Sequence, residues 1–221
     1  MGRPFYRPPF LSLSSASFQS KITTFLSLLA AVSAAPASEL ESRAVPKDTA
    51  FGFLALRSAS PIHYQSLNAS GGKIWLGKKT STYCPLPAKQ CPKGKDTSFW
   101  INNQGGTAGM NTVVPGGQQV YIGPTGELSY TQAHSAFIPT GSTQTGFKVT
   151  ERNNIVFLEN CNNSFLACPV DKKSKTSGPW QVFVDVKGKL KDKDVPTRCK
   201  KDCLGFTPAG GPVKDAVWQY A

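Results

Sequence analysis

The sequence is poor in the residues that build catalytic and metal sites. It has two histidines among 221 residues, no G-x-S-x-G nucleophile elbow and no C-x-x-C pair. His63 and His134 are far in sequence from every cysteine, whereas a zinc site uses ligands at short paired spacings. Glu127 and Asp185 are the acidic residues best placed for a pair of catalytic carboxylates, but neither lies in a motif. We therefore expect a chain that is not an enzyme and that has no metal and no cofactor.

The sequence also lacks an apolar run of the length that spans a membrane, about 20 residues. Its most apolar stretch, KITTFLSLLAAVSAA at 21–35, has a positive charge, a short apolar region and small residues at a cleavage site. These are the three parts of a secretory signal. We expect a signal peptide in residues 1–34, cleaved after Ala34, in which residues 1–20 are an atypical N-terminal extension. The C-terminal VKDAVWQYA has no hydrophobic tail, so we expect no membrane anchor and a secreted, extracellular chain.

Acidic residues are scarce, with 13 Asp and Glu against 25 Lys and Arg and a formal net charge of +12. The densest basic segment is KGKLKDKD at 187–194, followed by RCKK at 198–201. Such a segment is either a contact for a polyanion or wall polysaccharide, or a solvated loop. We favour the loop, because Asp192, Asp194 and Asp202 dilute the positive charge. Nucleic acid is not an expected partner of a secreted chain.

No stretch keeps the apolar spacing of an amphipathic helix for three turns, and short apolar runs interrupted by Gly, Pro and Asn indicate strands instead. We expect an all-β fold for residues 51–221, as a single compact domain stapled by disulfides and built as a β-trefoil, a barrel or a β-sandwich. Residues 35–50 are expected to be a flexible lead-in. The predicted strands lie in FGFLALRS from Phe51 onward, and at 73–77, 118–123, 127–132, 147–150, 155–158 and 180–186.

Turn residues and alternation add detail to this expectation. Pro124-Thr125-Gly126 and Asn153-Asn154 each separate two predicted strands and predict a hairpin. The stretch WQVFVDV at 180–186 alternates most cleanly, so one of its faces is expected to meet the core. The core-facing set is Trp180, Val182, Val184 and Val186, and the opposite set is Gln181, Phe183 and Asp185.

The chain has six cysteines, and an even number in an oxidising compartment predicts structural disulfides. Six cysteines allow 15 pairings. Cys84–Cys91 is the favoured local pair, because the prolines between the two residues pre-bend the loop. The remaining residues leave two alternatives open, which are Cys161–Cys168 with Cys199–Cys203, or Cys161–Cys199 with Cys168–Cys203.

Two kinds of surface feature point to sugars. The sequons at Asn68 and Asn162 lie in turn-like sequence and predict N-linked glycans in a secreted chain. Exposed aromatic rings stack on the apolar face of a pyranose, and Trp100 and Trp218 are the candidates for sugar contacts. Trp180 is expected in the core by its alternation, and Trp75 is a second core candidate.

Four blocks of the sequence are distinctive. They are FGFLALRSASPIHYQSLNASGGKIWLGKKTSTYCP, YTQAHSAFIPTGSTQTGF, SFLACPVDKKSKTSGPWQVFVDV, and DCLGF with the closing WQY. Together they resemble the fungal cell wall protein phiA family over nearly all of residues 51–221. The phrases FLACP and GPWQVF carry most of the specificity.

This resemblance implies a secreted, non-enzymatic fungal cell wall protein with a structural or binding role in phialide and conidium development. Wall polysaccharide is then the expected partner. The family includes IgE-binding, allergen-like proteins and proteins that provoke plant defence, so the alternative is an elicitor, effector or allergen-like protein that binds a host protein or wall polysaccharide. The cysteines of the ACP and DC-x-G phrases are family landmarks. They match Cys168 and Cys203, so the resemblance implies that pair and leaves Cys161–Cys199.

Overall fold

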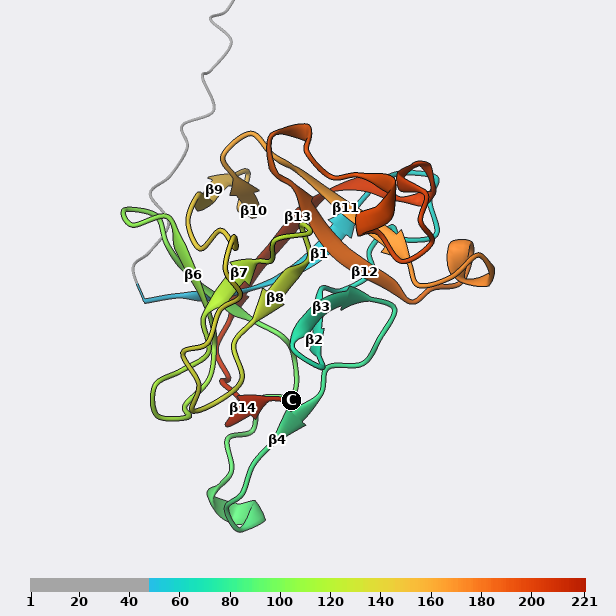
Figure 1. Cartoon of the computed structure of the whole chain (residues 1–221). Coiled ribbons are helices and arrows are strands. Elements are labelled where there is room, and N and C mark those ends of the chain that lie inside the picture. The colour runs from blue at the N-terminus through green and yellow to red at the C-terminus, as the bar shows by residue number, and fades with distance from the viewer. Residues whose placement is uncertain (1–47) are drawn as a thin grey trace, which may run out of the picture. The chain divides into compact units, whose positions relative to one another are not determined.

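Fourteen strands and five single-turn 3-10 helices form residues 48–221, the part of the chain that the computed structural model describes (Figure 1). No α-helix occurs in this part, which confirms the predicted all-β class. The strands are β1 (Ala50–Leu56), β2 (Asn68–Ser70), β3 (Lys73–Leu76), β4 (Thr82–Tyr83), β5 (Phe99–Asn102), β6 (Thr107–Met110), β7 (Val120–Ile122), β8 (Leu128–Tyr130), β9 (Phe147–Arg152), β10 (Ile155–Asn160), β11 (Ser164–Pro169), β12 (Trp180–Asp185), β13 (Leu204–Val213) and β14 (Gln219–Tyr220). The helices are η1 (Ala88–Gln90), η2 (Lys173–Lys175), η3 (Val186–Gly188), η4 (Asp192–Asp194) and η5 (Lys200–Asp202).

Several predictions concern residues outside this part. The signal peptide at 1–34, its cleavage after Ala34 and residues 35–47 of the lead-in all lie outside the described residues. Within residues 48–221, no helix is long and apolar enough to cross a membrane.

Both predicted hairpins are present. β7 and β8 pair antiparallel, with Ile122 opposite Leu128. β9 and β10 pair through a turn in which Asn153 and Asn154 have φ angles of 53° and 62°. Asparagine tolerates positive φ better than most residues, and two such residues form the turn that matches the twist of a hairpin. The asparagine pair therefore fixes the register of this hairpin.

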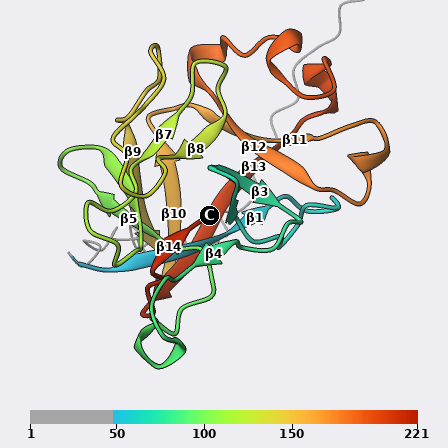
Figure 2. The same ribbon diagram turned by 60° about the horizontal axis from the view of Figure 1, so that its bottom comes forward.

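One sheet contains twelve of the strands. Its main path runs β6-β5-β1-β13-β11-β12-β3-β8-β7, while β10 pairs with β13 and β9, and β2 pairs with β3. The ten-residue strand β13 is central, because it pairs with β11 at its start and then with β1 and β10 on opposite edges. An isolated antiparallel bridge between Gly109 and Gln119 joins the two ends of the path. The sheet thus folds over on itself in a sandwich-like arrangement (Figures 1 and 2).

One core fills the space between the layers and takes the inward side chains of most strands. In β12, Trp180, Val182 and Val184 point into this core. Phe183 lies on the opposite face, in a second and smaller cluster with Leu190 and Val195. The alternation predicted for residues 180–186 is therefore confirmed, and the outward Phe183 is buried because a later segment of the chain covers it.

The structure contains two of the predicted disulfides. Cys84–Cys91 closes the loop around η1, with Cα atoms 6.1 Å apart. Cys168–Cys203 joins the end of β11 to the residue before β13, with Cα atoms 4.1 Å apart. The pair implied by the family resemblance, Cys168 with Cys203, is thus the one that forms.

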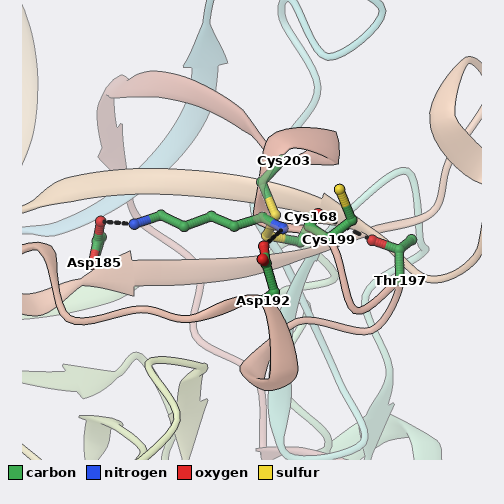
Figure 3. The surroundings of a disulfide bond; sticks show 7 residues. Cys168, Asp185, Asp192, Thr197, Cys199 and Cys203 are labelled. Atoms are coloured by element: carbon green, nitrogen blue, oxygen red, sulfur yellow. Dashed lines mark hydrogen bonds and ion pairs between the residues drawn. A yellow bond between two sulfur atoms is a disulfide. The ribbon is translucent and has the colours of Figure 1, made fainter.

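The third predicted pair, Cys161–Cys199, is wrong, because both residues are free thiols. Cys161 lies in the turn before β11, whereas Cys199 lies one turn before Cys203 and so beside the other end of β11 (Figure 3). The six residues of β11 separate the two positions by roughly 20 Å. A disulfide requires Cα atoms within about 7 Å, so this pair cannot close.

Candidate functional site

A groove of about 650 Å³ crosses the outer face of β1 and β13. Strand β1 is apolar on both of its faces. Phe51, Phe53 and Ala55 point into the core, while Leu54 and Leu56 alternate with them and line the groove. A strand with two apolar faces is normally covered on both, and here the outer face is open.

Two glycines form the floor of the groove, where Gly52 of β1 lies opposite Gly211 of β13. Neither has a side chain, so the sheet is hollowed at this point. The neighbouring Gly210 is required for packing, because a Cβ atom there would collide with the carbonyl oxygen of Gly52. A Cβ atom on Gly211 would meet no atom within 4 Å. The hollow at Gly211 is therefore free space in front of the sheet.

Three large side chains stand around this floor. Leu54 is 36% exposed, Ile155 is 44% exposed and Tyr64 is 65% exposed. Tyr64 is held in place by its backbone N–H, which donates to the carbonyl of Ala55 at 2.8 Å, and its ring stacks on His63 at 3.8 Å. An aromatic ring presented in this way is a platform on which another flat apolar surface can stack.

The other end of the groove is polar and rigid. Asp96 lines it, and the backbone carbonyl of Asp96 accepts a hydrogen bond from the Tyr220 hydroxyl at 2.9 Å. The same hydroxyl accepts from the N–H of Ser98 at 3.0 Å, and burial raises the pKa of Tyr220. Thr97 accepts from the N–H of Ala69 at 2.8 Å. These bonds fix the polar rim to the core, so the groove is preformed.

The groove has the chemistry that suits a carbohydrate. A pyranose ring has an apolar face for Tyr64 and Leu54, and hydroxyls for Asp96 and Ser66 at the rim. Small-molecule sites of this kind combine an apolar lining with a few placed polar groups. Residues 48–221 hold no group of three or more His, Cys, Asp or Glu side chains that could bind a metal.

The tryptophans predicted to contact sugar lie in different environments. Trp100 is 40% exposed, and its indole N–H donates to the side chain of Asn111 at 2.9 Å. It lies opposite Ala50, which places it on the same outward face of β1 as Leu54. Trp218 is only half-exposed, and its indole nitrogen is buried. Trp100 is therefore the better platform, and it lies beyond the groove on the same face of the sheet.

The remaining tryptophans are buried, and the two histidines lie apart from the groove floor. Trp75 and Trp180 are 9% and 1% exposed and belong to the interior, as expected. His63 accepts a hydrogen bond from the backbone N–H of Arg57 at 3.2 Å. His134 lies in a loop with a φ of 60° and lines a separate cavity of about 490 Å³.

The two predicted glycosylation sites differ in access. Asn68 lines the groove, but its side-chain amide donates to the carbonyl of Lys78 at 2.6 Å and its carbonyl accepts from Thr80 at 3.2 Å. Asn162 is exposed in the turn between β10 and β11. Glycosylation stays a prediction at both positions, and the geometry favours Asn162 because its amide nitrogen is the accessible one.

Sequence reasoning missed the groove residues Leu54, Tyr64 and Ile155. The sequence did contain a signal for Leu54. FGFLAL has apolar residues at odd and at even positions, so both faces of the strand are apolar, and such a strand is normally covered on each face. The positions of Tyr64 and Ile155 follow only from tertiary structure, because their segments pair with β1 and β13 from opposite sides.

Comparisons with known proteins agree with a secreted location. A family model described as "PhiA-like secreted protein" matches residues 51–221. An "Uncharacterized secreted protein" of Arthroderma benhamiae is 36% identical over 162 residues, which cover 70% of this chain and 76% of that protein. "Cell wall protein phiA" of Aspergillus fumigatus is 25% identical over 72% of this chain and 80% of its own length. The protein of the same name from Emericella nidulans is 29% identical over 54% of this chain and 62% of its own length. No solved structure matches. The chain therefore belongs to the PhiA-like secreted protein family.

Proposed function

We propose that this chain is a non-enzymatic protein of the fungal cell wall, held there by neutral wall polysaccharide that lies in the groove of β1 and β13. The observation that carries this proposal is the preformed groove, with its glycine floor, its exposed Tyr64 and its fixed polar rim. The names of the Aspergillus fumigatus and Emericella nidulans relatives support the location in the wall.

The expected mechanism of retention is stacking combined with hydrogen bonding. Sugar rings would lie with their apolar faces on Tyr64 and Leu54, and their hydroxyls would bond to the rim. A preformed groove limits the entropy lost on binding, so a few such contacts can give measurable affinity. Repetition along a polysaccharide then multiplies the weak single contacts into stable retention.

The test uses a variant that fills the groove. Gly211→Val places its side chain in the free space, and Gly211 does not have a positive φ, so the strand is expected to fold normally. Binding of the secreted full-length protein to insoluble β-glucan and chitin particles should fall by about tenfold or more, or ~1.4 kcal/mol. Tyr64→Ala should weaken binding in the same direction, because it removes the stacking platform.

The matched control is Thr207→Leu, which adds an apolar side chain on the same strand outside the groove. It should bind as the wild type does. Equal binding by the Gly211→Val, Tyr64→Ala and wild-type proteins would show that the groove does not hold polysaccharide. Release of the wild-type protein from walls by neither glucan nor chitin competitors would favour the alternative, an elicitor or effector that binds a host protein.

The proposed biological role is support of phialides and conidia, which the family resemblance suggests. A fungal strain that carries Gly211→Val at the native locus should secrete the protein normally but retain less of it in its walls. Conidium numbers should then fall towards those of a strain without the gene. Normal conidiation with depleted walls would separate wall retention from development and would refute this role.

A further inference from the structure

A second surface, independent of the groove, is the segment between β12 and β13, residues 186–203, which we name the basic lobe. It contains seven Lys and Arg residues and three Asp residues. Leu190 and Val195 anchor it on Phe183 of β12. The Cys168–Cys203 disulfide ties its end to β11 (Figure 3). A solvated loop needs no hydrophobic anchor and no disulfide. The lobe has both, so its surface is held in a fixed position on the domain.

Its carboxylates are used to fold it. Asp185, at the end of β12, accepts from the N–H of Leu190 at 2.8 Å and from the ammonium of Lys200 at 2.7 Å. Asp192 accepts from the backbone N–H of Lys200 at 2.7 Å (Figure 3). The Lys200 ammonium is therefore paired with Asp185 and adds little to the outward charge.

The other two acids have similar internal roles. Asp194 accepts from the backbone N–H of Lys191 at 2.9 Å. Asp202 pairs with Lys175 of η2 at 2.7 Å, and the hydrogen bond from Lys175 holds the pKa of the Asp202 carboxyl below its usual range. Of the three aspartates that were expected to dilute the positive charge, Asp192 and Asp194 thus bind the lobe's own backbone and Asp202 pairs with Lys175.

The other basic residues of the lobe are exposed to solvent. Within residues 48–221, six of them are exposed and take part in no ion pair, and they are Lys187, Lys189, Lys191, Lys193, Arg198 and Lys201. Like charges fixed on one small lobe repel each other, and an anionic partner relieves that repulsion. The lobe lacks aromatic residues, so it offers no platform on which nucleic acid bases can stack.

We propose that the basic lobe binds an anionic polysaccharide through its exposed lysines. This goes beyond the proposed function, because the ligand is charged and the surface is not the groove. The lobe's outer surface carries the interaction. The cavity beneath it, of about 280 Å³, is lined by Lys193 and Arg198 but also by Glu127 and Asp194, so it holds both signs of charge.

The test compares polymers of different charge. Wild-type full-length protein should bind dextran sulfate and polygalacturonate but not neutral dextran, and binding should weaken steeply between low and high salt. The triple variant Lys189→Gln, Lys191→Gln and Lys193→Gln should lose affinity about 100-fold at low ionic strength, or about fivefold for each lysine. The same three positions changed to Arg should keep the affinity, since charge is what matters.

The matched control removes the same charge elsewhere. Lys89→Gln, Lys93→Gln and Lys95→Gln remove three exposed lysines in and after the Cys84–Cys91 loop, and this variant should lose affinity less than about threefold. Equal losses in the two triple variants would overturn the proposal, because net charge alone would then explain binding. Tighter binding of single-stranded DNA than of either anionic polysaccharide would overturn it in favour of nucleic acid. Gly211→Val should leave dextran sulfate binding unchanged, because Gly211 lies in the groove and not in the lobe. The proposal for the lobe can therefore fail without affecting the proposal for the groove.

Discussion

Removal of the Cys168–Cys203 disulfide should destabilise the protein more than removal of Cys84–Cys91. The first bridge joins residues 35 apart in sequence, and the second joins residues 7 apart. A cross-link restricts the unfolded chain more when it closes a longer loop, and the loop-entropy relation gives about 4 kcal/mol for the first and about 2.5 kcal/mol for the second. The longer bridge also ties the basic lobe to β11, so its loss releases the contacts of Leu190 and Val195 as well.

The assay is reversible unfolding in urea under non-reducing conditions, with double variants in which both cysteines of a bridge become Ala. In thermal unfolding of the same variants, 4 kcal/mol corresponds to a fall in Tm of roughly 8–16 °C for a domain of this size. The Cys168→Ala/Cys203→Ala variant removes both partners of the bridge, so Cys199 is left with no nearby cysteine with which to pair instead. If the Cys168→Ala/Cys203→Ala protein were as stable as the Cys84→Ala/Cys91→Ala protein, the reasoning from loop length would be refuted.

The remaining predictions concern single groups. Alkylation of the native protein should label two thiols, with Cys161 faster than Cys199 because it is more exposed, and a protein without labelled thiols would contradict the free state. Peptide mapping should find a glycan at Asn162 and little at Asn68, and the reverse pattern would show that hydrogen bonding of the amide does not limit modification. Asp202 has a pKa lowered from 3.8, so its contribution to stability is full above that value and is lost as pH falls through the lowered pKa. Acid titration followed by circular dichroism should therefore show a loss of stability that a D202N variant lacks.

Local sequence signals predicted the local parts of the fold. The asparagine pair at 153–154 predicted a hairpin because two residues with positive φ make the required turn. The alternation of residues 180–186 predicted which side chains face the core, because the period of a strand is two. The prolines between Cys84 and Cys91 predicted that bridge, because its loop closes without help from the rest of the chain.

Features that depend on contacts between distant segments could not be predicted from the sequence. The groove requires Gly52 to lie opposite Gly211, and that register is set by strand pairing across most of the domain. The Cys161–Cys199 pair was wrong for the same reason, since the two residues flank opposite ends of β11 and only the sheet shows this. The interpretation of residues 187–201 as a solvated loop missed its anchor, because Phe183 is recognisable as the lobe's support only when the lobe is seen folded over it.

The groove and the basic lobe are spaced by one rigid element. β13 begins at Leu204, directly after the lobe, and reaches the groove floor at Gly211. At about 3.3 Å per residue these points are roughly 20 Å apart. A stiff spacer keeps two weak sites at a fixed separation, so the second contact forms at high effective concentration once the first has formed. If both proposed sites bind their polysaccharides, one small domain would hold neutral and anionic chains together at this fixed spacing.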